Sequence, residues 1–208
     1  MAPLRNDKEN GQVCYTVWDD MSACTEDDVA RLLPMVSNQR REQALRFTHL
    51  FGRWSCLKTY EMLRQLLKDN SSLDTVSLPV FAYTDSGKPY LSGGPQFSIS
   101  HCKKALMVAV SHHPVGVDIE SLRRPSPALI ERVMNRQEQT MIAQSVDPDR
   151  AFIRLWTAKE AVLKLRGTGL VDDMSDVLTG SEACYTKDRQ DYVFTIAIQK
   201  GQANNTIK

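Results

Sequence analysis

Two strand-type runs meet near the centre of the chain with only three residues between them. Residues 105–111 and 115–120 are rich in aliphatic and β-branched side chains, and His112, His113 and Pro114 separate them. So short a connection predicts either a hairpin or a close crossover. Because strand and helix patterns occur on both sides of it, the sequence predicts an α+β protein of two similar halves, residues 1–110 and 111–208, packed as one unit.

The first half begins with a strand and continues with helices. Residues 13–18 alternate in the manner of a strand. Thr25 stands before three acids, which is typical of a helix start because a hydroxyl cap and negative charge both suit that end. A second helical pattern follows Ser37 and runs to Lys68, with an interruption expected at Gly52.

The rest of the chain alternates between strands and helices. Residues 77–100 are rich in Gly, Pro and Ser, which predicts short strands joined by tight turns. Ser126 and Asp147 each precede a proline and predict two helix starts, the second helix running to Arg166. Residues 192–198 alternate as a late strand.

Composition excludes several classes of protein. No apolar run approaches the ~20 residues that cross a bilayer, and the first twelve residues are too polar for a secretory signal, so we expect a cytoplasmic protein without a membrane partner. Five cysteines without a CxxC pair favour reduced thiols over a disulfide framework or a zinc ribbon.

Positive charge is concentrated in one segment. Between residues 31 and 68, eight bases stand against two acids, Glu42 and Glu61. Such a surface attracts anions, although a solvated helix face is the alternative. No RNA- or DNA-binding signature accompanies the bases, so we expect no nucleic-acid partner.

The first candidate site is the run VGVDIE at residues 115–120. A strand has a side-chain period of two, so Asp118 and Glu120 point to one face. Two neighbouring carboxylates repel each other unless a cation compensates them, and oxygen-only ligation favours Mg²⁺. The alternative is a surface strand end whose acids pair with Arg123 and Arg124.

The second candidate is the helix RLWTAKEAVLKLRG at residues 154–167. Trp156, Glu160 and Lys164 fall four residues apart and therefore share a face. The alternative is an ordinary surface pair between Glu160 and Lys164, with Trp156 in the core. Lys159 falls on the apolar stripe of this helix, where its stem could lie along the surface while the ammonium reaches water.

The third candidate is the loop-rich run at residues 87–102. Turn glycines together with Lys88, Ser100 and His101 offer hydrogen-bond donors that suit phosphate oxygens. A generic polar loop is the alternative. Each of the three motifs is short, and none identifies a function by itself.

Taken in order, the segments GKP, FSISH, GVDIE and WTAKEAVLK resemble the surfactin-type 4′-phosphopantetheinyl transferases. That family has a histidine after an Ile-Ser pair, a G-[IV]-D-x-E strand, and a W-x-x-K-E-x-x-x-K helix some forty residues later. The resemblance covers residues 88–169 firmly and is looser over the basic helices at residues 40–64. It implies two α+β subdomains related by a pseudo-twofold axis, in a monomeric chain that binds coenzyme A in the cleft between them.

The resemblance also implies a catalytic arrangement. Asp118, Glu120 and Glu160 would hold Mg²⁺ against the diphosphate of coenzyme A, and Lys164 would contact a phosphate oxygen. Glu160 is then the candidate general base for the attacking hydroxyl. A carboxylate that ligates a metal is a weak base, so a metal-bound or bridging water is the alternative.

The nucleotide part of coenzyme A has its own set of implied residues. Lys88, Ser100 and His101 match family positions that line it, and Arg40 and Arg41 would help to bind its 3′-phosphate. The chain has Gln43 where a lysine can occur in the family.

The implied reaction is Mg²⁺-dependent transfer of the 4′-phosphopantetheine arm of coenzyme A to a serine of an apo acyl or peptidyl carrier protein, with release of adenosine 3′,5′-bisphosphate. Such carriers serve fatty acid, polyketide or nonribosomal peptide biosynthesis. One rival is a non-catalytic module that binds coenzyme A or a carrier protein. Another is a thiol or zinc hydrolase that uses Cys102 with the nearby histidines, although no HExxH motif is present.

Overall fold

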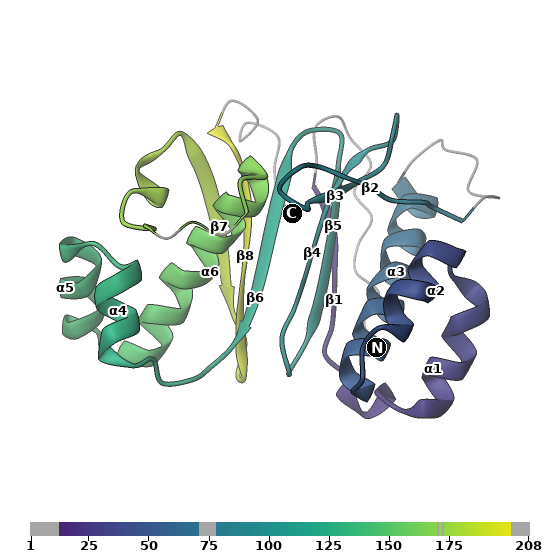
Figure 1. Ribbon diagram of the computed structural model, residues 1–208. Coiled ribbons are helices and arrows are strands. Elements are labelled where there is room, and N and C mark those ends of the chain that lie inside the picture. The colour runs from purple at the N-terminus through teal and green to yellow at the C-terminus, as the bar shows by residue number, and fades with distance from the viewer. Residues whose placement is uncertain (1–12, 71–77, 170, 172, 201–208) are drawn as a thin grey trace.

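The strand-type runs fold into two separate antiparallel sheets in the computed structural model, which describes residues 13–70, 78–169, 171 and 173–200 (Figure 1). The first sheet has the order β1-β5-β4 and the second the order β6-β8-β7. Their strands are β1 (Cys14–Trp18), β4 (Gln96–His101), β5 (Leu106–Ser111), β6 (Val115–Ser121), β7 (Glu182–Asp188) and β8 (Tyr192–Gln199). A small pair, β2 (Ala82–Tyr83) and β3 (Pro89–Tyr90), completes the strands of the described residues.

The helices follow the same order in both halves of this mixed α/β protein. Three lie between the first and second large strands of each half: α1 (Glu26–Leu32), α2 (Asn38–Leu45) and α3 (Leu50–Asn70), then α4 (Pro127–Val133), α5 (Arg136–Gln144) and α6 (Pro148–Arg166). Short 3-10 turns occupy Met21–Ala23, Leu33–Met35 and Val177–Thr179. No helix in the described part of the chain is long and apolar enough to cross a bilayer.

The two sheets lie between two groups of helices, with α1 to α3 on one side and α4 to α6 on the other (Figure 1). The period of β5 explains this layering. Leu106, Val108 and Val110 face the core shared with α3, whereas Met107 and Ala109 face the core between the sheets. Because both faces of β5 are covered, all six of its residues are buried.

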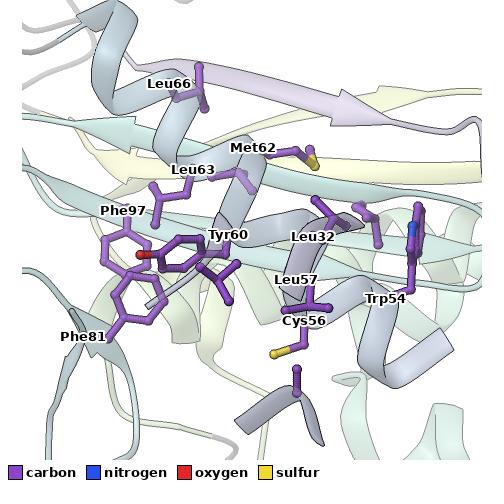
Figure 2. Close-up of a cluster of buried hydrophobic side chains, with 14 of the residues drawn as sticks. Leu32, Trp54, Cys56, Leu57, Tyr60, Met62, Leu63, Leu66, Phe81 and Phe97 are labelled. Atoms are coloured by element: carbon purple, nitrogen blue, oxygen red, sulfur yellow. The ribbon is translucent and has the colours of Figure 1, made fainter. Parts of the chain in front are cut away.

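The helix α3 covers the first sheet with a continuous apolar stripe. Trp54, Leu57, Tyr60 and Leu63 recur at intervals of three and are fully buried (Figure 2). Tyr60 packs on Phe81 with ring centroids 5.6 Å apart. Burial of each such side chain contributes about 1.5–3 kcal/mol, so this stripe is a main source of stability in the first half.

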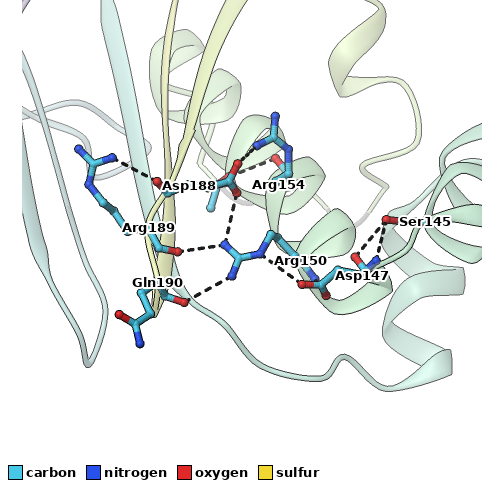
Figure 3. A network of polar contacts seen from close by, with 8 residues as sticks. Ser145, Asp147, Arg150, Arg154, Asp188, Arg189 and Gln190 are labelled. Carbon is cyan, nitrogen blue, oxygen red and sulfur yellow. Dashed lines mark hydrogen bonds and ion pairs between the residues drawn. The ribbon is translucent and has the colours of Figure 1, made fainter.

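The N-terminal half of α6 is fastened to the turn between β7 and β8 by polar contacts (Figure 3). Arg150 forms an ion pair with Asp147 at 3.2 Å and donates to the carbonyl oxygen of Arg189 at 3.0 Å. Arg154 forms an ion pair with Asp188. These groups are partly exposed and stabilise little individually, so they add only modestly to the packing of α6 on β6 and β8.

The connection at residues 112–114 is a crossover, and the expected alternative of a hairpin is wrong. β5 pairs with β1 and β4, whereas β6 pairs with β8. The chain therefore passes from one sheet to the other at this point. The expected strand at residues 13–18 and the late strand at residues 192–198 are confirmed as β1 and β8.

The expected helix starts are confirmed. Thr25, Ser37, Ser126 and Asp147 each accept a backbone N–H at the start of their helix. The helix α6 ends at Gly167, whose φ of 71° lies in the left-handed region that glycine tolerates.

The interruption expected at Gly52 falls earlier, between α2 and α3 at residues 46–49. Gly52 lies in the first turn of α3, where a Cβ would stand 2.6 Å from the Phe47 ring and 2.7 Å from the His49 ring. The backbone N–H of Gly52 donates to Nδ1 of His49 at 3.0 Å. Glycine therefore permits the tight corner before the helix and does not break the helix itself.

Two elements of the second half were not predicted. The helix α5 begins with a capping box, in which Asn135 and Glu138 exchange side-chain and backbone hydrogen bonds. This N-x-x-E pattern is a readable start signal. The strand β7 alternates weakly because it is an edge strand with several exposed residues, so its sequence gives little periodic signal.

Candidate active site

The candidate site forms where β6 runs along α6. Val117 and Ile119 point into the core between the sheets, so the alternate residues Gly116, Asp118 and Glu120 point toward α6. Gly116 is required for this approach, because a Cβ there would lie 2.0 Å from the carbonyl oxygen of Ala161. The glycine of the GVDIE motif thus brings the strand and the helix close enough for their side chains to meet.

Lys164 joins the helix to the strand. Its Nζ donates to Oδ1 of Asp118 at 2.6 Å and to Oγ of Ser100 at 2.9 Å. The Ser100 hydroxyl donates to the same Asp118 oxygen at 2.8 Å. The Asp118 side chain is almost fully buried, and its Oδ2 is a buried oxygen without a hydrogen-bond partner. Three motifs that are far apart in sequence therefore meet at one carboxylate.

Glu120 and Glu160 add two more carboxylates to this region. Burial, together with the charges of Asp118 and Glu120, raises the pKa of Glu160 to about 7 against the opposing effect of Lys164. Burial and the Asp118 charge also raise the pKa of Glu120. The three acids are therefore close enough to repel one another, and the site carries more negative charge than Lys164 alone neutralises.

The two arginines that could have paired with Asp118 and Glu120 at a surface strand end do not do so. Arg123 and Arg124 are exposed, and in the described residues neither forms an ion pair with Asp118 or Glu120. Trp156 is not simply a core residue, because its indole N–H donates to Oε1 of Glu120 at 3.3 Å. The signal in the sequence was that Trp156 lies four residues before Glu160 and therefore shares the face of α6 that meets Glu120.

The donor set fits a hard divalent cation. All the candidate donors are carboxylate oxygens, they lack sufficient countercharge, and Asp118 presents a buried oxygen with no partner. Among the residues that the structure describes, no three His, Cys, Asp or Glu side chains stand in coordinating geometry. The three carboxylates would therefore have to move from the positions seen here to coordinate one ion together.

A pocket of about 210 Å³ adjoins this site at the C-terminal end of α6. Lys88 of the first half and Lys164 and Gly167 of the second half line it. The turn between β2 and β3 reaches α6 here, where Ser86 Oγ donates to the carbonyl oxygen of Gly167 at 2.5 Å. Burial lowers the pKa of Lys88, and a bound anion would act in the opposite direction by favouring the ammonium form.

His101 lies at the end of β4, one residue beyond Ser100. Its ring stacks on Phe51, with centroids 5.8 Å apart and an interplanar angle of 29°. The His101 side chain is partly exposed. Partial burial of the imidazole lowers its pKa, and the positive charges of Lys164 and Arg40 lower it further. The His101 side chain therefore lies on the α3 face of β4, opposite to the Ser100 side chain that contacts Asp118.

The two arginines of α2 are engaged in packing. Arg40 is buried, donates to the carbonyl oxygen of Cys56 at 2.9 Å and to Oγ1 of Thr59 at 3.1 Å, and lies over the Phe81 ring. Arg41 donates to the carbonyl oxygen of Leu33 at 3.1 Å. Most of the guanidinium of Arg40 thus holds α2 on α3.

The cationic surface expected between residues 31 and 68 is compensated in part by ion pairs. Arg31 and Lys58 both form ion pairs with Glu61, and Arg53 forms one with Glu26. Lys58 also lies 3.7 Å from the centroid of the Trp18 ring. These bases therefore contribute less free positive charge than the sequence count suggests.

Lys159 does not extend its ammonium to water, contrary to expectation. The side chain is fully buried, and Nζ forms an ion pair with Glu138 at 2.7 Å. It also donates to the carbonyl oxygens of Val133 at 2.9 Å and Met174 at 2.7 Å. All three ammonium protons are used, which is why a buried lysine is tolerated on this apolar stripe.

The residues of the rival thiol or zinc hydrolase are not assembled. His101 and His112 lie at opposite ends of the β4–β5 hairpin, since His101 pairs with Leu106 and Ser111 pairs with Gln96. Burial raises the pKa of Cys102, which disfavours the reactive thiolate.

Comparison with known proteins agrees with this geometry. The model of the 4′-phosphopantetheinyl transferase superfamily matches residues 114–206. The chain is 31% identical over 163 residues to a 4′-phosphopantetheinyl transferase of Bacillus subtilis, which covers 75% of this chain and 70% of the relative. It is 31% identical over 156 residues to psf-1 of Bacillus pumilus, with 73% and 66% covered. It is 27% identical over 160 residues to Sfp of Bacillus subtilis strain 168, with 75% and 70% covered.

The chain thus spans about two thirds of the length of these curated relatives. The residues matched by the family model include the carboxylate site. The chain belongs to the surfactin-type 4′-phosphopantetheinyl transferases, a family of enzymes that transfer phosphopantetheine from coenzyme A to carrier proteins.

Proposed function

We propose that this chain uses Mg²⁺ to transfer the 4′-phosphopantetheine arm of coenzyme A to a serine hydroxyl of an apo acyl or peptidyl carrier protein, and that it releases adenosine 3′,5′-bisphosphate. The observation that carries the proposal is the meeting of three undercompensated carboxylates, from β6 and α6, beside Lys164. Family membership supports the transfer itself. The metal and the residue roles are inferred from the site.

Coenzyme A would bind between residues 1–110 and residues 111–208. Apart from the small pair β2 and β3, both halves have the order of one strand, three helices and two strands, which supports two subdomains related by a pseudo-twofold axis. The pocket supports the location, because Lys88 comes from the first subdomain and Lys164 from the second. We further propose a monomeric, cytoplasmic enzyme, consistent with its free cysteines.

Asp118, Glu120 and Glu160 would hold the Mg²⁺ ion, which when bound neutralises charge that develops on the diphosphate oxygens. The remaining work falls to the protein. Lys164 is placed to donate to a phosphate oxygen while it holds Asp118 in position. Trp156 holds Glu120 through its indole N–H.

Glu160 is the proposed general base. It lies on the same face of α6 as Lys164, one helical turn away, and it is only half-buried, so an incoming hydroxyl can reach it. Proton removal from the carrier serine would make its oxygen the nucleophile that attacks the β-phosphorus of coenzyme A. A water molecule bridging Glu160 and the serine would serve the same purpose.

Lys88, His101 and Lys164 are the proposed contacts to the nucleotide and its phosphates. Lys88 and Lys164 line the pocket, and His101 lies beside it at the end of β4. We propose that Arg41 binds the 3′-phosphate together with the N–H groups of Arg40 that do not donate to Cys56, Gln43 and Thr59.

The test is modification of a purified apo carrier protein with coenzyme A and Mg²⁺, followed by mass spectrometry. Wild type should add the mass of the phosphopantetheine arm, and Asp118→Ala should lose at least about a hundredfold in rate, because one removed ligand typically disables a metal site. Glu131→Ala, on the exposed face of α4, is the matched control and should behave as wild type.

Two results would contradict the proposal. Undiminished transfer by Asp118→Ala would remove the metal assignment. Binding of coenzyme A or carrier protein by wild type without any mass gain would indicate a non-catalytic binding module instead.

A further inference from the structure

A row of polar side chains crosses the second sheet beneath α6. Asp118 of β6 pairs with Thr195 of β8, which in turn pairs with Thr186 of β7. Cross-strand partners point to the same face of a sheet, and here that face meets α6, which packs on all three strands (Figure 1). Thr157 of α6 lies over the middle of the row, with its Oγ1 2.9 Å from Oγ1 of Thr195. A buried hydroxyl contact between helix and sheet is therefore the neighbour of Asp118.

The direction of the hydrogen bonds in this row follows from one fixed end. Thr157 Oγ1 donates to the carbonyl oxygen of Arg154 at 3.1 Å, and a carbonyl oxygen only accepts. Because a hydroxyl has one proton, Thr195 must donate to Thr157. Thr186, whose Oγ1 is 2.8 Å from that of Thr195, must then donate to Thr195. The row thus ends on the backbone of α6 and carries no proton to the carboxylates, so its effect on them is through the placement of the helix.

The buried hydroxyls restrict how α6 can lie on the sheet. Thr157 and Thr195 are fully buried, and a buried hydroxyl costs free energy unless it is paired. Valine has nearly the same shape as threonine and would fill the same space without that requirement. A hydrogen bond weakens steeply with distance and angle, so it allows fewer orientations than an apolar contact does. Threonine at residue 157 therefore selects one rotation of the helix.

A second contact fixes α6 on a different strand. A Cβ at Gly116 of β6 would stand 2.0 Å from the carbonyl oxygen of Ala161, so the helix lies as close to β6 as the backbone permits. Thr157 and Ala161 are four residues apart and share the face of α6 that meets the sheet. Trp156 and Glu160 each precede one of them by one residue and form the adjacent row. Rotation of α6 about its axis would therefore move these two site residues together.

The contact between Trp156 and Glu120 is sensitive to such a rotation. The indole Nε1 lies 3.3 Å from Oε1 of Glu120, at the long end of the range for an N–H···O hydrogen bond. A small further separation would break it. The position of the indole N–H therefore reports the rotation of α6, and it does so without any metal.

We propose that Thr157 is a positioning residue for the transferase site. Its hydroxyl, held by Thr195, sets the rotation of α6 at which Trp156 meets Glu120 and Glu160 approaches the carboxylates of β6. The role passes through Trp156 and Glu160. This inference rests on the proposed function of those carboxylates.

The test compares wild type with Thr157→Val, Thr157→Ser and Thr186→Val. The indole N–H signals of the three tryptophans are recorded by NMR in EDTA, with Trp156 assigned from Trp156→Phe. Mn²⁺ affinity is then measured by electron paramagnetic resonance with saturating coenzyme A. Thr157→Val should shift the Trp156 signal, speed its exchange with solvent and weaken Mn²⁺ binding roughly tenfold, which is the lower end for a lost outer contact.

The other two variants separate position from stability. Thr186→Val loses the same kind of hydroxyl contact, but on the side away from α6, so it should keep the wild-type indole signal and Mn²⁺ affinity. Thr157→Ser keeps the hydroxyl and loses a buried methyl group. It should unfold at lower urea concentration than wild type and yet retain the site, with Mn²⁺ affinity within about twofold of wild type.

Three outcomes would overturn the inference. An unchanged Trp156 signal in Thr157→Val would mean that the hydroxyl does not set the rotation of α6. Equal changes in Thr157→Val and Thr186→Val would assign the effect to the packing of the sheet as a whole. A Thr157→Ser variant that behaves like Thr157→Val would assign it to the methyl group.

Failure of the proposed metal site would be recognised separately. Wild type would then bind coenzyme A but no Mn²⁺, whereas a shift of the Trp156 signal confined to Thr157→Val would still support the placement of α6. If Thr157→Val does not fold, Thr195→Val removes the same contact from the side of β8 and leaves the sequence of α6 unaltered. It should also shift the Trp156 signal, and an unchanged signal would contradict the role of Thr157.

Discussion

Replacing Glu160 with glutamine should stabilise the metal-free protein at alkaline pH, although it should disable the enzyme. The pKa of Glu160 is raised from its ordinary value of 4.5 to about 7, mainly by burial and then by the charges of Asp118 and Glu120. The folded state therefore binds a proton at Glu160 more tightly than the unfolded state does. The stability that this provides is fully present below pH 4.5 and is lost as pH rises through about 7.

The magnitude follows from the pKa difference. At about 1.4 kcal/mol for each pKa unit, ionised Glu160 costs the folded state up to ~3 kcal/mol at pH 8 and below ~1 kcal/mol at pH 5. Glutamine carries no charge at either pH. The difference in unfolding free energy between Glu160→Gln and wild type should therefore be larger at pH 8 than at pH 5 by about 2 kcal/mol.

The assay is urea denaturation of both proteins in EDTA at the two pH values, with Glu131→Gln as an exposed control. Comparing two pH values removes the constant effect of burying an amide. Addition of Mg²⁺ at pH 8 should then stabilise wild type more than Glu160→Gln. A difference that does not change with pH would refute the electrostatic account of this carboxylate cluster.

Three further predictions concern residues around the site. Lys159→Met should lower the unfolding free energy by about 3–5 kcal/mol in urea denaturation, because the buried Glu138 carboxylate loses its only cationic partner among the described residues. Adding Glu138→Gln should recover part of that loss. Equal stability of the single and double variants would contradict this. Gly116→Ala should abolish Mn²⁺ binding and lower the melting temperature, since a methyl group cannot fit 2.0 Å from the Ala161 carbonyl oxygen. Cys102→Ser should lose little transferase activity in the mass assay, and near-complete loss would give the thiol a role in the site.

Local patterns predicted a large part of the candidate site. The period of two in β6 correctly put Asp118 and Glu120 on one face, and the spacing of four in α6 did the same for Glu160 and Lys164. These relations hold within a few residues, where backbone geometry fixes the direction of each side chain. The same holds for the helix caps at Thr25, Ser126 and Asp147, whose partners lie three residues away along the chain.

Other features depended on partners that the local pattern does not contain. The β-type runs at the centre of the chain were identified, but their separation into two sheets follows from pairing with β1, β4 and β8. Likewise, the fit of Gly116 against α6 joins residues some forty-five positions apart, as does the contact of Lys164 with Asp118.

The sequence by itself determined which residues are strand or helix over most of the chain, and which side chains share a face. Only the tertiary structure decided that Lys159 is buried against Glu138, that Arg40 is used in packing, and that Ser100 contacts Asp118. The physical reason is that periodicity reports the geometry of one segment. The environment of a charged or polar side chain depends on the segment that packs against it, and the free energy of that contact arises only when both are brought together.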